Sequence, residues 1–231
     1  MPKPSWKLLV PAAVLVLSSS LLISPVPADA VVSAGTTTTV TTWQQRLHAK
    51  YQAYRRHCSA PKAANSIVSG PQVTLLIAKQ TDPGEIAAAA AAGCDGSLIS
   101  QGRVYSNAMV STEDQPAGMM TAGTTTPTVV ETRIKFPSAK GMHGGVWIQS
   151  EGNRGPEIDL VESYGTRVTH VHHVTGASDQ RGYKSLKKSA TWYKKEHTFR
   201  VEFTTAKIVY SIDGKVTNTV TNANLPADMR Y

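Results

Sequence analysis

Short segments that alternate apolar and polar residues recur along the chain from Arg103 onward, and Gly, Pro, Asn and Asp separate them. Such segments, rich in Val, Ile, Thr and Tyr, are typical of β-strands joined by turns. The last one contains Asp213-Gly214, which predicts the turn of a β-hairpin. Many short strands with almost no helix predict an all-β fold, a two-sheet sandwich or jelly roll. The predicted strands are residues 103–111, 128–136, 145–149, 157–164, 167–174, 197–204 and 207–220.

The chain before this region is less regular. Gln72–Lys79 (QVTLLIAK) follows Gly70-Pro71 and is predicted as a further strand. Trp43–His57 is basic and suits a short helix or an irregular opening strand equally well, so the pattern does not separate the two.

The one convincing helix lies between Asp82 and Gly93, and its two ends carry the clearest signals. Asp82 can cap it, Pro83 suits the first helical position, and Glu85 completes a capping box. A run of alanines supplies helix propensity, and Gly93 ends the helix. Because the helix has no bulky apolar face, we expect a short Ala-rich insertion on the surface rather than a core element.

The N-terminal segment has the features of a secretory signal peptide. Lys3 and Lys7 precede the apolar stretch Leu8–Ile23, and the small residues of Ala28-Asp29-Ala30 suit a signal peptidase. A single membrane anchor is the alternative, which Pro11 and the absence of a basic stop-transfer cluster disfavour. We therefore predict that residues 1–30 are a signal peptide and that the chain is secreted, extracellular or bound to a cell wall, with no membrane contact after signal removal.

The composition fits one domain behind that signal. The chain has 231 residues, 41% hydrophobic and 17% charged, so it can build one packed core, and disorder of the whole chain is excluded. The Thr-rich residues 31–42 have few anchoring side chains and are predicted as a spacer, which leaves 43–231 as the domain. The net charge of +8 raises the question of nucleic acid. In a secreted chain this charge fits wall polymers better, and no nucleic-acid partner is expected.

Two cysteines, Cys58 and Cys94, remain in a chain that leaves the reducing cytosol. An even count in an oxidising compartment favours a disulfide. Closing the loop between them contributes roughly 3 to 4 kcal/mol of chain entropy if the geometry permits the bond. Two unpaired thiols are the alternative.

Three carboxylates, Glu157, Asp159 and Glu162, lie close together in an otherwise apolar strand. On a regular strand Glu162 points away from the other two and enters the core unpaired, at a cost of several kcal/mol. A β-bulge near Leu160-Val161 returns Glu162 to their face, so the sequence predicts that bulge. Crowded carboxylates keep a neutral acid beside an ionised one, which suits a retaining glycosidase. An exposed acidic edge strand and a calcium site are the alternatives.

The stretch GVWIQSEGNRGPEIDLVESYG resembles the catalytic strand of the family-16 glycoside hydrolases, whose signature is E-x-D-x-x-E in its bulged form. The segments RVYSNAMVST, TVVETRIKFPSAKGMHGGVWIQ and HTFRVEFTTAKIVYSIDGKV resemble family segments in the same order. Weaker similarity begins near Asn65–Gly70 and runs to the end. The bulged form resembles laminarinases more than lichenases. Because the family ordinarily continues beyond the position of Tyr231, we expect its final strands to be missing here.

This resemblance implies a concanavalin-like β-jelly roll with a sugar-binding cleft across its concave sheet. It implies Glu157 as the nucleophile, Asp159 as the assisting carboxylate and Glu162 as the general acid/base of a double displacement. No cofactor is expected, and a structural calcium is left open.

Four further residues are candidates for substrate binding. Trp147 can stack on a sugar ring or pack in the core. Glu131 and Arg133 match cleft-lining positions of the family, or form a surface ion pair. The histidines within 170–173 look like a metal cluster, but no Cys or further strand completes the ligands. The resemblance instead places His172 beside the catalytic strand.

The leading hypothesis is a secreted, monomeric, retaining endo-glycosidase that hydrolyses a β-glucan with β-1,3 or mixed linkages, so a polysaccharide substrate is the expected partner. A non-catalytic carbohydrate-binding protein of the same fold is the alternative. A third hypothesis is contact with an anionic polymer, through basic residues of one predicted loop that alternate with aromatic residues. These residues are Lys184, Lys187, Lys188, Lys194 and Lys195.

Overall fold

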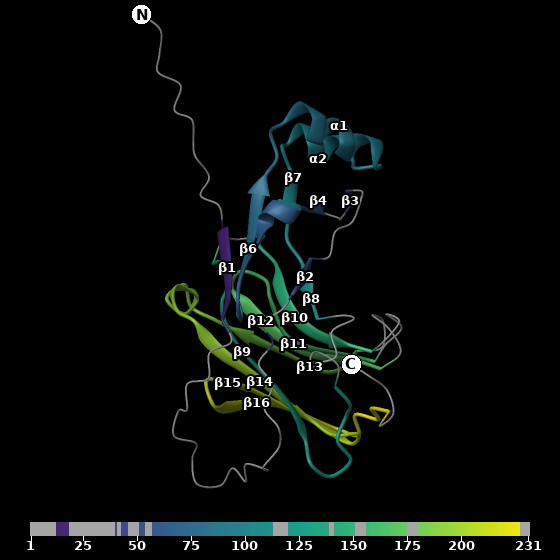
Figure 1. Cartoon of the computed structure of the whole chain (residues 1–231), viewed down its shortest axis with the longest axis vertical. Helices are drawn as coiled ribbons and strands as arrows, with labels where there is room; N and C mark the ends of the chain where they lie inside the picture. The colour runs from purple at the N-terminus through teal and green to yellow at the C-terminus, as the bar shows by residue number, and fades with distance from the viewer. Residues whose placement is uncertain are drawn as a thin grey trace, which may run out of the picture.

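The structure is a computed structural model, and it describes residues 13–18, 40, 43–45, 51–53, 57–112, 120–138, 141–150, 156–174 and 180–226. Strands dominate these residues and form two layers that face each other (Figure 1). One layer is a four-stranded sheet, and the other is part of a ten-stranded sheet that continues toward two short helices. The all-β sandwich predicted from the sequence is confirmed.

The four-stranded sheet has the order β10-β11-β12-β13, and its neighbouring strands are antiparallel. Its strands are β10 (Gly144–Gln149), β11 (Glu157–Ser163), β12 (Arg167–His173) and β13 (Gln180–Lys187). The first three lie within one residue of their predicted bounds. The sequence does not predict β13, because QRGYKSLK is polar and mostly exposed and has no clear apolar alternation.

The ten-stranded sheet has the order β16-β15-β14-β9-β1-β6-β7-β4-β3, and β5 also pairs with β6. A separate short pair joins β2 to β8. The bounds are β1 (Ala13–Ser18), β2 (Gln44–Gln45), β3 (Gln52–Ala53), β4 (Cys58–Pro61), β5 (Ser66–Ser69), β6 (Gln72–Lys79), β7 (Val104–Asn107), β8 (Val110–Ser111), β9 (Thr128–Lys135), β14 (His197–Phe203), β15 (Lys207–Ile212) and β16 (Lys215–Thr221).

Most predicted strands of this sheet are confirmed, with local differences. The span 103–111 is split into β7 and β8. The hairpin β15–β16 turns at Asp213 and Gly214, which both have positive φ, as a two-residue turn of type I′ requires. The described residues within 43–57 include two short strands and no helix, which agrees with the irregular opening strand rather than the helix.

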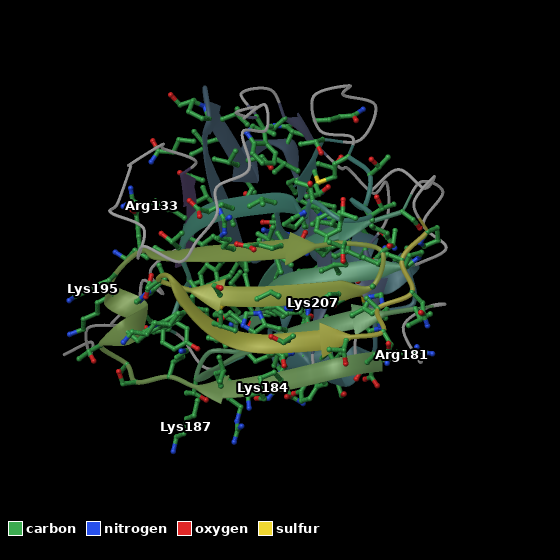
Figure 2. All side chains as sticks on the ribbon, turned by 90° about the horizontal axis from the view of Figure 1, so that it is seen from below. Arg133, Arg181, Lys184, Lys187, Lys195 and Lys207 are labelled. Atoms are coloured by element: carbon green, nitrogen blue, oxygen red, sulfur yellow. A yellow bond between two sulfur atoms is a disulfide. The ribbon has the colours of Figure 1, made fainter. Side chains whose placement is uncertain are left out.

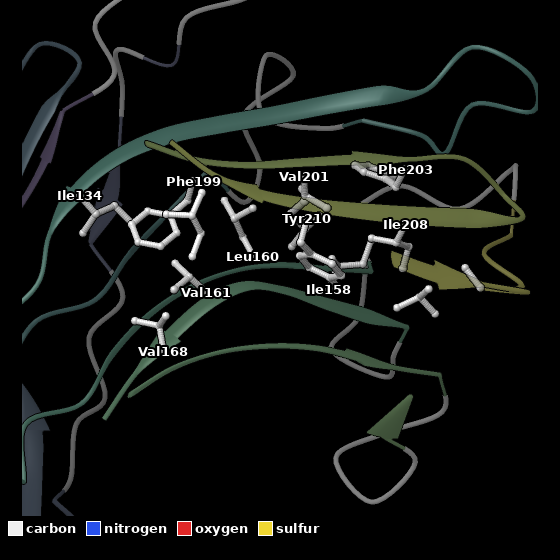
Figure 3. Close-up of a cluster of buried hydrophobic side chains, with 14 of the residues drawn as sticks. Ile134, Ile158, Leu160, Val161, Val168, Phe199, Val201, Phe203, Ile208 and Tyr210 are labelled. Atoms are coloured by element: carbon white, nitrogen blue, oxygen red, sulfur yellow. The ribbon is translucent and has the colours of Figure 1, made fainter. Parts of the chain in front are cut away.

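The core lies between the two layers, where the inward-facing apolar side chains of both sheets meet (Figure 3). Ile158 and Leu160 contribute from β11, and Phe199, Val201 and Tyr210 contribute from β14 and β15. All five are fully buried. Burying one large apolar side chain contributes roughly 1.5–3 kcal/mol, so this cluster fixes which side of β11 faces outward.

The helical insertion consists of α1 (Pro83–Ala91) and α2 (Gly96–Ser100). The carboxylate of Asp82 caps α1 by accepting a hydrogen bond from the Glu85 amide at 3.0 Å, as predicted. Glu85 does not complete the expected capping box with its side chain, which instead accepts hydrogen bonds from Tyr51 at 2.6 Å and Lys62 at 2.9 Å.

A disulfide joins Cys58 on β4 to Cys94 beyond α1, so the predicted pairing is confirmed. The two cysteines form a small buried cluster with Tyr51, Ala89 and Val104. The insertion is therefore attached to the sheet by its own minor core and by a covalent bond, although most of α1 is exposed.

The strand β1 lies inside the predicted signal peptide. Its backbone pairs with β6 along all six residues and with β9 through Val16–Ser18, so β1 joins the two parts of the large sheet in the full chain. Signal cleavage stays a prediction, and in a cleaved chain these edges of β6 and β9 lose their partner. The predicted spacer 31–42 lies outside the described residues except for residue 40. None of the described helices is long and apolar enough to cross a membrane.

Candidate active site

One extra residue in β11 shapes the site. Between β10 and β11 the register shifts next to the pair Trp147–Asp159, and Leu160 is skipped. Between β11 and β12 it shifts between Asp159 and Glu162. Leu160 and Val161 are both fully buried, so the chain makes two core contacts in a row before Glu162 turns outward again. The bulge that the sequence predicts is present.

The three carboxylates consequently share the outer face of the four-stranded sheet. Glu157 and Glu162 are half-buried, whereas Asp159 is only 5% exposed. The register places His173 of β12 opposite Glu157 and Thr169 opposite Glu162. The structure therefore brings together all three predicted catalytic residues, with polar residues of a neighbouring strand beside them.

Glu157 and Asp159 form one acid pair. Gln149 donates a hydrogen bond to Glu157 at 2.9 Å. The pKa of Asp159 is raised to about 8. The largest cause is burial, followed by the negative charges of Glu157 and Glu162 and by a hydrogen bond to Glu157. His173 Nε2 lies 3.1 Å from Asp159 Oδ2, and a neutral imidazole can donate there, so the contact does not require an ionised Asp159. A protonated Asp159 can in turn donate to an ionised Glu157.

Glu162 has different neighbours. Its Oε1 atom accepts a hydrogen bond from the Tyr164 hydroxyl at 2.7 Å and lies 3.1 Å from His143 Nε2, while Thr169 donates to Oε2 at 3.4 Å. Burial raises the pKa of Glu162, but the hydrogen bonds of His143 and Tyr164 outweigh it, and the pKa lies below its ordinary value. One strand thus carries acids in two distinct electrostatic environments.

Trp147 lies on the face of the carboxylates, directly opposite Asp159 in the register. Its side chain is 40% exposed, in contrast to the buried Ile148 that follows it. The core-packing alternative therefore does not hold. An accessible indole beside the acids can stack on the apolar face of a sugar ring.

The structure changes which histidine meets the acids. His172 is fully buried, and its ring nitrogens lie 3.2 Å from the Glu157 carbonyl oxygen and 2.9 Å from that of Ala223. This geometry excludes the expected substrate contact for His172, which instead ties β12 to the C-terminal segment. His173 faces the acids because side chains alternate along β12. Strand alternation on β12 is the signal that could have identified it from the sequence.

Glu131 and Arg133 are placed on the other sheet, so the expected position in the cleft is wrong for both. They lie on β9 on the side opposite to the buried Ile134, and therefore face away from the core. Glu131 pairs with Arg200 at 3.5 Å, and Arg133 pairs with Glu196 at 2.8 Å. The alternative, a surface pair between Glu131 and Arg133, is not among the described ion pairs either, because each residue pairs with a partner from another strand or loop.

The basic residues expected in one loop are divided between a strand and a turn. Lys184 and Lys187 lie on β13 and project from this edge of the sheet (Figure 2). Lys194 belongs to a short 3₁₀ turn, and Lys188 Nζ lies 5.2 Å from the centre of the Trp192 ring. Lys187 is directly opposite Arg167 of β12 in the register.

One group of side chains could hold a metal ion. One ligand atom each of Glu157, Asp159 and His173 lies within 4.8 Å of the others. Two carboxylates and an imidazole suit a transition metal better than calcium, which takes six to eight oxygen ligands. Because these are also the predicted catalytic groups, a metal there would compete with acid chemistry. The structural calcium stays an untested prediction.

The fold is shared with solved glucanase structures. An endo-β-1,3-glucanase from Pyrococcus furiosus is 20% identical with a TM-score of 0.51, over 71% of this chain and 60% of that enzyme. The β-glucanase of Bacillus licheniformis is 16% identical with a TM-score of 0.53, over 84% and 80% of the two chains. SCLam, a non-specific endo-β-1,3(4)-glucanase, is 16% identical with a TM-score of 0.58, over 81% and 70%. At these identities the likeness defines the class of fold, a jelly roll.

The sequence also matches the model of one protein family, "Glycosyl hydrolases family 16", over residues 96–231. This span is more than half of the chain and contains the whole carboxylate strand. The protein belongs to this family and is a glycosyl hydrolase, so the resemblance noted in the sequence is confirmed. No curated protein matches the chain.

Proposed function

We propose that the protein is a secreted, retaining endo-glycosidase that hydrolyses a β-glucan with β-1,3 or mixed linkages. The observation that carries this proposal is the bulge in β11, which gathers Glu157, Asp159 and Glu162 on one outer face. A retaining mechanism needs one ionised carboxylate and one proton donor across the glycosidic bond. The acids of β11 lie in separate environments, which raise the pKa of Asp159 and lower that of Glu162, so the proton that Glu162 donates needs a further source.

In the first step, the carboxylate of Glu157 attacks the anomeric carbon while protonated Glu162 gives its proton to the leaving glycosidic oxygen. This forms a glycosyl ester on Glu157 and releases one end of the polymer. In the second step, ionised Glu162 removes a proton from water, and the resulting hydroxyl attacks the anomeric carbon and frees Glu157. Asp159, protonated near neutral pH, supports Glu157 by the hydrogen bond between them.

Two observations support a β-glucan as substrate. Trp147 offers an exposed ring beside the acids, which suits a neutral sugar with an apolar face. The similar solved structures are described as β-1,3-, β-1,3(4)- and β-glucanases. Secretion is supported by the N-terminal signal pattern and by the disulfide between Cys58 and Cys94, a bond typical of proteins outside the reducing cytosol.

The direct test measures reducing sugar released from laminarin and from mixed-linkage glucan by the mature protein. Glu157→Gln should lower release at least about 10³-fold, because removal of a nucleophile disables the unit as a whole. Glu131→Gln is the matched control, since it changes the same residue type on the far sheet and should leave release unchanged. Glucan binding without hydrolysis at any pH would instead select the carbohydrate-binding alternative.

A further inference from the structure

The strongest polar cluster outside the expected triad surrounds Glu162. His143 Nε2 and the Tyr164 hydroxyl both contact the same oxygen, Oε1, at 3.1 and 2.7 Å. The two rings stack on each other with centroids 4.7 Å apart and planes 26° apart. His143 precedes β10 and Tyr164 follows β11, so two segments of the chain converge on one carboxylate oxygen.

This arrangement conflicts with the role of Glu162 if the residue acts alone. The first step of hydrolysis requires a proton on Glu162, yet its donors stabilise the ionised form and lower its pKa. Tyr164 cannot supply the proton, because burial and the neighbouring Glu162 raise its pKa far above neutral. Thr169 does not titrate. Among the residues with a described hydrogen bond to Glu162, His143 is the one whose side-chain type exchanges a proton near neutral pH.

We propose that His143 stores the proton that Glu162 delivers, so that the two side chains act as one general acid. The delivery of the proton to a glycosidic oxygen rests on the proposed function, whereas the sharing of a proton between His143 and Glu162 does not. Before turnover, the pair holds one proton across the Nε2–Oε1 contact. When Glu162 protonates the leaving oxygen, His143 is left as neutral imidazole. When Glu162 takes a proton from water in the second step, that proton returns the pair to its starting state.

The ionisable groups around the pair are compatible with this storage. His57 interacts with His143, and both burial and the charge of His143 lower the pKa of His57. Asp159 and Tyr183 interact electrostatically with Tyr164, and Glu162 adds to the burial and charges that favour protonated Asp159. Among the described residues, the carboxylate that forms an ion pair with a protonated His143 is that of Glu162. His143 acts through Glu162 and is a positioning residue.

The pH profile of kcat/KM on a hydrolysed glucan tests the proposal. In the wild-type protein, activity should fall at high pH when the pair loses its shared proton. His143→Phe keeps a ring to stack on Tyr164 but removes the stored proton. A lone carboxylic acid ordinarily releases its proton about two pH units below an imidazole, so the falling limb should move to lower pH by roughly one to two units.

Two matched variants separate proton storage from simple hydrogen bonding to Glu162. His143→Gln can still donate a hydrogen bond to Glu162, so it should show the same shift of the limb with a higher plateau than His143→Phe. Tyr164→Phe removes a donor but keeps the imidazole, so it should lower the plateau and leave the limb within about half a pH unit of wild type. A limb that stays in place or moves to higher pH in both His143 variants would overturn the proposal.

A second readout does not depend on activity. The imidazole of His143 is titrated by NMR in the wild-type protein and in Glu162→Gln, with signals assigned from His143→Phe and His57→Gln. Loss of the anionic partner should lower the midpoint of His143 by on the order of one pH unit. An unchanged midpoint rejects the pair. If the midpoint is lowered but the protein hydrolyses no glucan, the proton-sharing pair of His143 and Glu162 is supported and only the proposed reaction is rejected.

Discussion

The two outer faces of the sandwich both carry charged side chains on their strands, and they differ in the residues that those side chains contact. On the ten-stranded sheet, Arg200 contacts both Glu131 and Glu202, and Arg133 contacts Glu196. On the four-stranded sheet, none of the described ion pairs joins Glu157, Asp159 or Glu162 to a lysine or an arginine. Their described polar partners are glutamine, tyrosine, threonine and histidine side chains.

This difference distinguishes a solvated surface of ion pairs from a surface whose acids can exchange protons. An exposed acid beside an arginine stays ionised and contributes little else. Acids that are crowded and partly buried without a permanent positive charge must share protons, and the raised pKa of Asp159 follows from this. The residue types are similar on both faces, and the distinction comes from the bulge and from the lack of Lys or Arg partners for these acids among the described ion pairs.

The largest expected effect is that of Asp159→Asn on the pH dependence of protein stability. Folded Asp159 keeps its proton up to a pH of about 8. An unfolded aspartate releases its proton near pH 4, so the wild-type protein loses stability between these pH values as the pH rises. The variant avoids that loss, which at about 1.4 kcal/mol for each pH unit between the two values amounts to roughly 5 kcal/mol at pH 9, with little difference at pH 4. Urea unfolding across this range measures the effect.

The control for this prediction is Glu131→Gln on the far face. Its carboxylate lies beside Arg200 at the surface, so the difference from wild type should stay nearly constant between pH 5 and pH 9. If the stability difference between Asp159→Asn and wild type were equally independent of pH, the inference that Asp159 is protonated near neutral pH would be wrong.

A smaller effect is expected from removing an exposed apolar side chain on each face. Trp147 is 40% exposed beside the acids, and Val129 is 41% exposed on β9. Trp147→Ala should raise KM for a glucan roughly fivefold to tenfold, because stacking contributes about 1 kcal/mol. Val129→Ala should leave KM unchanged. Equal KM values for Trp147→Ala and Val129→Ala would show that Trp147 does not contact the sugar.

The smallest effect is expected from Arg200→Gln. This change breaks the contacts of Arg200 with Glu131 and Glu202, which are solvent-exposed ion pairs. The free energy of unfolding should fall by less than about 1 kcal/mol, and kcat should not change. A clear loss of kcat in a variant of normal stability would mean that the far face influences the site.

The sequence predicted the strands with clear alternation and missed those without it. The bounds of β6 agree fully, and those of β9, β11 and β14 to within one residue. The bulge could also be predicted, because a regular strand would bury Glu162 without a partner. β13 could not, because an exposed edge strand need not carry an apolar stripe.

The candidate site was predictable along β11 and poorly predictable around it. The resemblance placed Glu131 and Arg133 beside the acids. Alternation could not correct this expectation, because it states which residues share a strand face but not which sheet a strand joins. Register across strands is likewise absent from a single sequence. His143 contacts Glu162 because the start of β10 pairs with the end of β11, a relation that local patterns do not contain.

The strand β1 has a consequence for the order of events in the cell. Its six residues are hydrogen-bonded between β6 and β9, and a segment in that state is closed to any export factor that must bind it as a free chain. β6 and β9 are synthesised well after β1, since they lie at Gln72–Lys79 and Thr128–Lys135. If residues 1–30 act as the predicted signal peptide, export and folding compete for the same six residues, and export must engage them before β9 is complete.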